Sequence, residues 1–270
     1  MNNINIKIVL LLTGFFAVAG CSTDEKQTVT TKNKLVLEDN FDTDGVLNSD
    51  IWSYDIGTGP NGDGWGNNEL QYYTDRTENI KVEDGMLKIT AIKESFMGSS
   101  YTSAKITTKG KVNQKYGRIE ARIKMPWGKG LWPAFWMLGA DIDSNPWPSA
   151  GEIDIVEYLG NQPTKILGTV HGPGYAGAES ISKSYTLTNS RFDTDFHVFG
   201  IEWDENYINF YVDDVLYNQI TPEDVPGEWV FNKPYYIILN MAVGGNLPGS
   251  PNASTSFPQQ MIIDYVRIYE

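Results

Sequence analysis

Hydrophobic residues in this chain come in short runs, and most runs are bounded by glycine, proline, asparagine or aspartate. Runs of roughly four to eight branched and aromatic residues between such turn residues predict β-strands. The clearest runs span residues 35–41, 80–82, 86–92, 103–108, 116–125, 166–170, 196–203, 207–212, 215–219, 235–241 and 261–269. No long helical pattern interrupts them, so the sequence predicts an all-β sandwich or jelly roll.

Residues 151–160 form one such run, which carries three acids among branched and aromatic residues. Alternate residues of a strand share a face, so Glu152 and Asp154 point the same way. Glu157 falls on the opposite face unless one extra residue interrupts the strand. We therefore predict a β-bulge at residues 155–156 that turns all three acids to one face. A solvated acidic face on an edge strand is the alternative interpretation.

The N-terminus has the pattern of a processing signal and not of a folded element. Lys7 precedes an apolar stretch, residues 8–18, that is too short to span a bilayer as a helix, and small residues follow it up to Cys21. This arrangement resembles a bacterial lipoprotein signal. We therefore expect residues 1–20 to be removed and Cys21, the only cysteine, to be lipidated. An ordinary signal peptide with an incidental cysteine is the alternative.

The polar, threonine-rich residues 21–34 are expected to form a flexible tether between lipid and domain. Acids directly after Cys21 resemble the surface-export tags of some lipoproteins. We therefore expect an exported bacterial lipoprotein of the outer membrane, held there by its lipid alone, and the tags favour the cell-surface side. No linker divides residues 35–270, which we predict to be a single domain.

Charge narrows the range of partners. Loss of Lys7 with the signal lowers the 21 basic residues to 20, against 34 acidic ones, a formal charge of −14. This sign argues against nucleic acid as a partner. It suits a neutral substrate and leaves carboxylates for a hard cation. Acidic surfaces are also simply soluble, so charge alone leads no further.

Tryptophans gather before the acidic strand, among glycine and proline residues of the kind that build surface loops. They are Trp127, Trp132, Trp136 and Trp147. One or two are expected in the core, where tryptophan usually lies. Exposed indole rings beside carboxylates suit a sugar, whose C–H face stacks on an aromatic plane. Paired acids, one attacking or activating water and one protonating the leaving oxygen, indicate glycoside hydrolysis.

Strand spacing also indicates a stereochemical class. Around one bulge, Glu152 and Glu157 lie four strand positions apart, so their Cα atoms are at most about 13 Å apart. Side chains that lean inward can close this to the roughly 5–5.5 Å of a retaining enzyme. Asp154 lies between them, where it can bond to the nucleophile and keep one acid ionised and the other protonated.

The motif at residues 151–157 resembles the signature of glycoside hydrolase family 16, in the Glu-x-Asp-x-x-Glu form of its bulge-containing branch. Further matches occur in the same order at residues 65–73, 116–118, 132–137, 147–148, 171–172, 199–203 and 240–245. They cover nearly the whole domain. Together they are most similar to the laminarinases, the endo-β-1,3-glucanases of that family.

The resemblance implies a concanavalin-like β-jelly roll of two curved antiparallel sheets, with a substrate cleft on the concave face. It implies retaining hydrolysis with Glu152 as nucleophile, Glu157 as general acid/base and Asp154 as helper. Substrate-binding positions implied by the resemblance are Asn67, Arg118, Trp132, Trp136, Trp147 and His171. The alternatives are a surface ion pair for Arg118 and a structural rim position for His171; the other histidine, His197, is expected to be structural.

Many family members carry a structural calcium ion on the convex side. The matching positions here are Glu38, Gly85 and Asp264. Backbone carbonyls supply part of such a site, so side-chain identity tests it poorly. A plain turn at Gly85 and a solvent-facing Asp264 are the alternative. No cofactor is expected for catalysis, and a monomer is expected.

Three functions remain to be compared. The first is endo-hydrolysis of β-1,3-glucosidic bonds in laminarin-type glucans. The second is a related hydrolase, a mixed-linkage β-glucanase or an enzyme of the agarase or porphyranase type. Loops 57–66, 140–149 and 171–178 contain no lysine or arginine, which favours a neutral glucan. The third is a non-catalytic glucan-binding protein, but such proteins typically lack the two glutamates that this chain has.

Overall fold

The computed structural model describes residues 32–270, which form two stacked β-sheets. The larger has ten strands in the order β15-β14-β13-β8-β17-β5-β6-β3, with β1 beside β17 and β4 beside β5. Its strands are β1 (Leu35–Asp39), β3 (Gln71–Tyr73), β4 (Ile80–Glu83), β5 (Met86–Phe96), β6 (Ser99–Ser103), β8 (Gly117–Lys124), β13 (His197–Trp203), β14 (Ile208–Val212), β15 (Val215–Ile220) and β17 (Gln259–Tyr269).

The smaller sheet has seven strands in the order β12-β11-β10-β9-β16-β7-β2. They are β2 (Ser53–Tyr54), β7 (Lys105–Thr107), β9 (Leu131–Gly139), β10 (Glu152–Tyr158), β11 (Lys165–His171), β12 (Ile181–Thr186) and β16 (Tyr235–Val243). Strand pairs are antiparallel except β3 with β6. Helical structure within residues 32–270 is limited to the turns η1 (Gly64–Asn68) and η2 (Gly177–Glu179). The predicted all-β jelly roll of two antiparallel sheets is confirmed.

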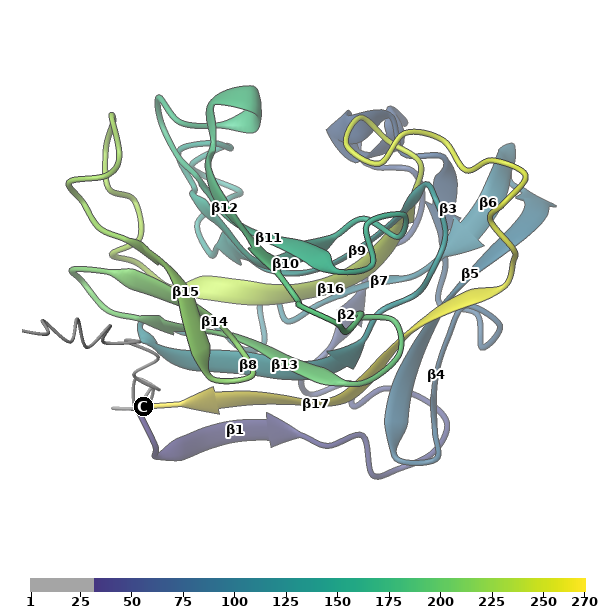
Figure 1. The fold of residues 1–270 in the computed structure, drawn as a ribbon, viewed down its shortest axis with the longest axis horizontal. Helices are drawn as coiled ribbons and strands as arrows, with labels where there is room; N and C mark the ends of the chain where they lie inside the picture. Colours follow the sequence, from purple (N-terminus) through teal and green to yellow (C-terminus); the bar gives the residue numbers. More distant parts are fainter. Residues whose placement is uncertain (1–31) are drawn as a thin grey trace, which may run out of the picture.

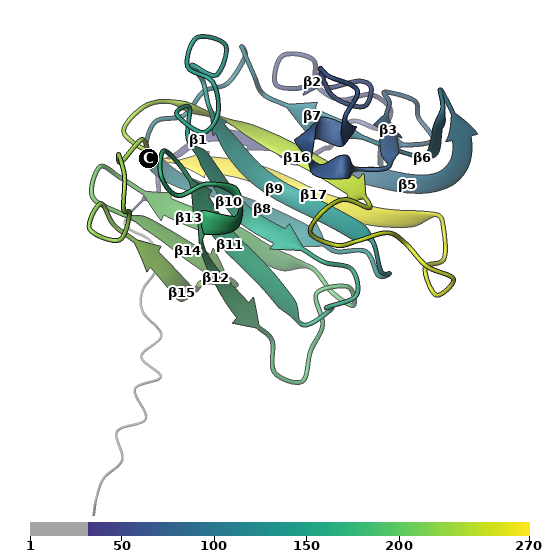
Figure 2. The same cartoon turned by 90° about the horizontal axis from the view of Figure 1, so that it is seen from above.

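The seven-stranded sheet is curved, and loops rise beside it at both ends (Figure 1). One group lies next to β12, and the other lies next to β3. Seen from above, the blue turn η1 lies beside the yellow loop that follows β16 (Figure 2). The Asn68 side chain donates a hydrogen bond of 2.8 Å to Asn246 in that loop. These loops form the rim of the concave face.

Side-chain alternation explains how the sheets stack. In β8, Ile119, Ala121 and Ile123 are 0% exposed and face the other sheet. The charged residues between them, including Arg118 and Glu120, therefore point to the outer face. β16 lies inside the seven-stranded sheet, and all nine of its residues are buried. The apolar residues between the two sheets form one continuous core.

β17 is the last strand of the chain and lies within the larger sheet. Its residues 259–263 pair with β5 and its residues 266–269 pair with β1, so β5 and β1 share one of its edges. β8 pairs along the other edge. Beyond β1 and β17, Lys34 N donates to Glu270 O at 3.0 Å, and Glu270 N donates to Lys34 O at 2.8 Å.

The first strand is shorter than the predicted span of residues 35–41. It ends at Asp39, because Phe41 has a left-handed φ of 55° and its N–H bonds to the Asp39 carboxylate at 3.0 Å. The predicted signal (residues 1–20), Cys21 and most of the tether (21–34) lie outside the described residues. From residue 32 onward, the structure contains no helix that is long and apolar enough to cross a membrane.

Candidate active site

The predicted bulge in β10 is present. Between Asp154 and Glu157 the strand advances three residues while its partner β11 advances only two, from Thr169 to Leu167. The register with β9 shifts just after Asp154 as well. The extra residue restores parity, so Glu152, Asp154 and Glu157 share one face of the strand. The apolar residues of β10 point into the core.

Two hydrogen bonds orient the carboxyl group of Glu157. The indole N–H of Trp132 donates to its Oε1 at 3.1 Å, and the hydroxyl of Thr169 donates to its Oε2 at 3.2 Å. Each oxygen therefore has its own donor. A hollow of about 190 Å³ opens beside this carboxyl group. It is lined by Glu157, Leu159, Gln162, Lys165, Leu167 and Leu247.

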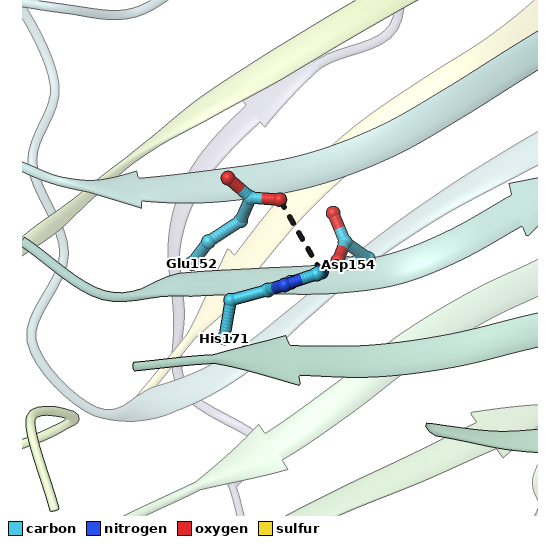
Figure 3. Close-up of side chains that lie close together, drawn as sticks. All are labelled: Glu152, Asp154 and His171. Carbon is cyan, nitrogen blue, oxygen red and sulfur yellow. Dashed lines mark ion pairs between the residues drawn. The ribbon is translucent and has the colours of Figure 1, made fainter. Parts of the chain in front are cut away.

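His171 lies on β11 directly opposite Glu152 and completes the cluster. Its Nε2 is 3.2 Å from Asp154 Oδ2 and 3.6 Å from Glu152 Oε1. Figure 3 shows the three side chains converging from two neighbouring strands. The imidazole thus faces the two acids that begin the motif.

These three side chains also have the composition of a metal site, since one ligand atom from each lies within 4.8 Å of the others. The hydrogen bond that His171 accepts argues against metal binding at this ring. Gly177 N donates to His171 Nδ1 at 3.1 Å, so the neutral ring carries its proton on Nε2, the nitrogen that lies 3.2 Å from Asp154 Oδ2. A metal on Nε2 would require the proton on Nδ1, facing the Gly177 N–H. The ring of His171 therefore presents an N–H, and not a lone pair, to the two acids.

Burial governs the protonation of the three acids. Burial, followed by repulsion from Asp154, raises the pKa of Glu152 from 4.5 to about 8. Burial and the charge of Glu157 raise the pKa of Asp154 well above its usual range. Burial also raises the pKa of Glu157, against the opposing effects of His171 and of its hydrogen bonds. Three adjacent buried carboxyl groups therefore hold at least one proton near neutral pH, as a general acid requires.

Three of the predicted tryptophan positions lie around this cluster. Trp136 is opposite Asp154 on β9, and its indole N–H donates to Asn240 at 2.7 Å. Trp147 is 45% exposed, with its ring centroid 6.0 Å from that of His171. Trp132 bonds to the acid Glu157, a contact that the sequence did not suggest. Their roles in stacking sugars stay predictions.

Asn67 lies in the rim, in turn η1. Its carbonyl accepts a hydrogen bond of 2.8 Å from Asn246 N. A Cβ atom at Gly245 would lie 3.2 Å from this carbonyl and 3.3 Å from the Trp132 ring, so the three residues are close neighbours. Gly245 has a φ of 114°, which favours glycine at this close approach. Asn67 thus lies beside Trp132, which in turn bonds to Glu157, and its role in substrate binding stays a prediction.

The prediction that Arg118 lies in the substrate cleft is wrong. It belongs to β8 of the ten-stranded sheet and points away from the concave face. Its guanidinium donates to Glu120 at 2.6 Å and to Asp214 at 2.7 Å. The alternative of an ion pair is therefore correct, but its expected place at the surface is wrong, because only 6% of the Arg118 side chain is exposed. His197 is also structural, with Nδ1 2.6 Å from the Asp213 carboxylate on the same sheet.

Sequence reasoning missed several polar residues next to the tryptophans and acids. Thr169 was not assigned a role, yet it bonds Glu157 and lies 2.9 Å from Ser182. Asn240 accepts from Trp136 and donates to the Tyr73 hydroxyl at 3.0 Å. Of these residues, only Asn240 could have been identified from the sequence, because it begins one of the motifs that resemble the family. Nothing marked Lys105, which lies between two tryptophan rings.

The three positions implied for calcium lie around the junction of β1 and β5 on β17. Both carboxylates are paired with arginine: Asp264 with Arg122 at 2.5 Å, and Glu38 with Arg267 at 3.6 Å. Gly85 lies in the tight turn between β4 and β5, with a φ of 69°. Each carboxylate therefore already shares one oxygen with an arginine, so calcium here would depend in large part on backbone carbonyls.

Comparisons with known proteins agree with this geometry. The profile of the glycosyl hydrolases family 16 matches residues 67–267. The "Beta-glucanase" of Rhodothermus marinus is 42% identical over 246 residues, which cover 87% of this chain and 85% of that protein. The catalytic domain of an endo-1,3-beta-glucanase (laminarinase) from Thermotoga petrophila RKU-1 has a TM-score of 0.84 and 49% identity, covering 88% of this chain and 98% of that one.

A third relative has a name of a different kind. The "Beta-1,3-glucan-binding protein" of Penaeus monodon is 33% identical over 315 residues, covering 93% of this chain and 84% of that protein. The scaffold is thus shared by proteins named as hydrolases and by one named for binding. The profile match spans most of this chain and includes the whole acidic strand. This chain therefore belongs to the glycosyl hydrolases family 16.

Proposed function

We propose that this protein is an endo-acting, retaining hydrolase of β-1,3-glucosidic bonds in laminarin-type glucans. The observation that carries the proposal is the bulge in β10, which turns Glu152, Asp154 and Glu157 to one face. The relatives named as a laminarinase and a β-glucanase support the choice of substrate.

The proposed reaction uses this chain's own carboxyl groups and needs no cofactor. Because the pKa of Glu152 is about 8 in the free protein, the proton that the three acids share must lie on Glu157 when the reaction begins. The Glu152 carboxylate then attacks the anomeric carbon and forms a glycosyl–enzyme ester, while Glu157 gives this proton to the departing oxygen. Glu157 then takes a proton from water, whose oxygen displaces Glu152 and restores the free enzyme. Trp132 and Thr169 hold Glu157 in place through both steps. Asp154 bonds to Glu152 and helps to separate the proton affinities of the pair.

A panel of polysaccharides tests this proposal directly. Laminarin, a mixed-linkage β-glucan, agarose and porphyran are each incubated with the enzyme, and products are sized over time. We expect oligosaccharides of several lengths to appear early from laminarin, because an endo-enzyme cuts inside the chain. Release of fragments only from agarose or porphyran would overturn the substrate assignment. Binding of laminarin with no new reducing ends would favour a non-catalytic protein.

A mixed-linkage glucanase is the second candidate. Its chemistry would be unchanged, and only the sugar sites beside the acids would differ. The rim loops at 57–66, 140–149 and 171–178 carry no cation for a sulfated chain, which supports a neutral glucan of either linkage. Initial rates on laminarin and on mixed-linkage glucan, measured at equal mass concentration, rank the two.

We further propose that the protein is an exported lipoprotein anchored through Cys21, acting as a monomer. The support is the apolar stretch followed by small residues and a lone cysteine. Fractionation of cells that express the full chain tests it, with Cys21→Ala as the comparison. The wild type should be found with the outer membrane, and the variant should be released from it. Equal membrane fractions for both proteins would contradict the anchor.

A structural calcium ion is also proposed, held by backbone carbonyls near Glu38, Gly85 and Asp264. The support is that β1 and β5 meet on one edge of β17 at this point. A ligand that binds only the folded state raises its stability, so a chelator should lower the melting temperature and added calcium should restore it. An unchanged melting temperature would remove the ion from the proposal.

A further inference from the structure

A buried lysine lies between two tryptophan rings at the β7 end of the concave face. Lys105 begins β7, where it pairs with Asn240 of β16. Its Nζ lies 3.9 Å from the ring centroid of Trp65 and 5.3 Å from that of Trp136. Only 10% of its side chain is exposed. An ammonium group over an indole face is attracted by the ring, and the attraction is strongest where water is excluded.

The charge of this lysine has a fixed set of neighbours. Asp55 Oδ2 lies 3.4 Å from Nζ, and Asp55 N also bonds to the Lys105 carbonyl at 3.0 Å. Glu69 also attracts the ammonium, and the Glu69 carboxylate is held by the Gln71 side chain at 2.6 Å. Burial lowers the pKa of Lys105, while Asp55 and Glu69 raise it. The buried cation thus has partial compensation from two indole rings, from Asp55 and Glu69, and least from the more distant Glu152.

One of the two rings belongs to a strained segment. Trp65 in η1 has a left-handed φ of 57°, and Asn68 has one of 56°. Such conformations are costly for residues other than glycine, so surrounding contacts must hold them. Three contacts hold the Trp65 ring: its indole N–H donates to the Gly57 carbonyl at 3.4 Å, the Tyr73 ring lies with its centroid 5.6 Å away, and the Lys105 ammonium lies over its face. The same turn carries Asn67 at the rim.

The other ring adjoins the acids. Trp136 is the cross-strand neighbour of Asp154, and Asn240 fixes its indole nitrogen. The ammonium therefore contacts both the rim turn η1, through Trp65, and the floor of the site, through Trp136. Because it is nearly covered, it has little surface of its own to offer a sugar. Its effect must pass through the two rings.

We propose that Lys105 is a positioning residue that fixes the Trp65 ring relative to Trp136 and so preorganises the aromatic surface at this end of the concave face. The inference rests on the proposed glucan hydrolysis. Loss of the charge should weaken binding of the sugar units that lie over this end. Without the ammonium the Trp65 ring is no longer fixed in the free enzyme, so part of the free energy of binding is used to order the ring. The chemical step at Glu152 and Glu157 should be little changed.

The test compares Lys105→Met with Lys105→Arg. Methionine keeps an apolar stem but removes the charge, whereas arginine keeps the charge and can stack on indole. On laminarin we expect Lys105→Met to raise KM about tenfold with kcat within about twofold, and Lys105→Arg to recover most of the loss. Near-ultraviolet circular dichroism without substrate should change in Lys105→Met, because the two indole rings lose their fixed arrangement.

Lys115→Met is the matched control. Lys115 lies 4.8 Å from the Tyr116 ring in an exposed position outside the concave face, so the same substitution there should leave KM unchanged. A fall in kcat at constant KM, an unchanged circular dichroism spectrum, or no recovery in folded Lys105→Arg would each overturn the proposal. Inactivity of the wild type on all β-1,3-glucans would instead overturn the proposed function, so the two failures are distinguishable.

Discussion

Two faces of the molecule bury carboxylates in opposite ways. On the outer face of the ten-stranded sheet, Arg118 pairs with Glu120, and both side chains are at most 7% exposed. On the concave face, the basic side chain within ion-pair distance of Glu152 and Asp154 is His171, and Glu157 is held by the neutral donors Trp132 and Thr169. A buried charge is stable when it is paired and costly when it is not. The outer face is therefore built for stability, and the concave face retains unpaired acids for chemistry.

The largest effect should come from removing one unpaired acid. Glu152→Gln keeps the shape of the side chain but removes the nucleophile, so kcat on laminarin should fall roughly 10⁴-fold or more. Laminarin binding by the variant should persist, as measured by affinity electrophoresis or calorimetry. Turnover within about tenfold of the wild type would mean that this face does not hold the nucleophile.

The second acid can be tested by rescue. Glu157→Gln should lose about 10³-fold on laminarin, yet much less on an aryl glycoside whose leaving group needs no proton. Added azide should restore turnover, because it attacks the glycosyl–enzyme without help from a general base. Rates on the aryl substrate with and without azide measure this. If azide restores nothing, Glu157 does not act as the acid/base.

On the outer face, breaking a pair should affect stability and not catalysis. Arg118→Met leaves Glu120 buried without its partner, so the free energy of unfolding should fall by about 3 kcal/mol. Denaturant unfolding measures this, and kcat of the folded variant should match the wild type. Replacing both residues by apolar ones should recover part of the loss. A variant Arg118→Met that is as stable as the wild type but impaired in catalysis would mean that this arginine acts in substrate binding.

On the concave face, removing a buried acid should raise the free energy of unfolding instead of lowering it. The pKa of Glu152 is about 8 when folded, against an ordinary 4.5, so the folded state keeps a proton that the unfolded state has lost between these values. Its carboxyl group costs nothing below pH 4.5, and the cost grows as pH rises toward 8. Glu152→Gln should therefore stabilise the protein at pH 8 by on the order of 4 kcal/mol, and hardly at pH 4. Unfolding curves at both pH values check this, and an equal difference at both would contradict it.

Ion pairs that are exposed to solvent should contribute least to stability. Lys34 and Glu270 lie 3.6 Å apart with side chains 75% and 54% exposed. Lys34→Ala should change the free energy of unfolding by less than about 0.5 kcal/mol, and salt should reduce even that. Thermal unfolding at low and high ionic strength measures the effect. A loss of unfolding free energy as large as that in Arg118→Met would mean that burial does not determine how much an ion pair stabilises this protein.

Local pattern predicted what depends on neighbours along the chain. The parity of Glu152, Asp154 and Glu157 was enough to predict a bulge, because a strand allows only two faces. The same alternation put Arg118 opposite the apolar residues of β8, but it cannot tell which of two stacked sheets a strand joins. That choice depends on pairing with β13 and β17, which lie far along the sequence. Lys105 had no signal for the same reason, since Trp65 and Trp136 are distant in sequence.

The position of β17 has a consequence for how the molecule assembles. This strand is synthesised after β1, β5 and β8, yet it joins β8 on one side to β5 and β1 on the other. The larger sheet therefore cannot close until residues 259–269 are available, and its contacts span most of the chain. Folds dominated by such distant pairings fold slowly. A chain whose synthesis stops before β17 should remain sensitive to proteases. Resistance to proteolysis should appear once residues 259–269 have been added.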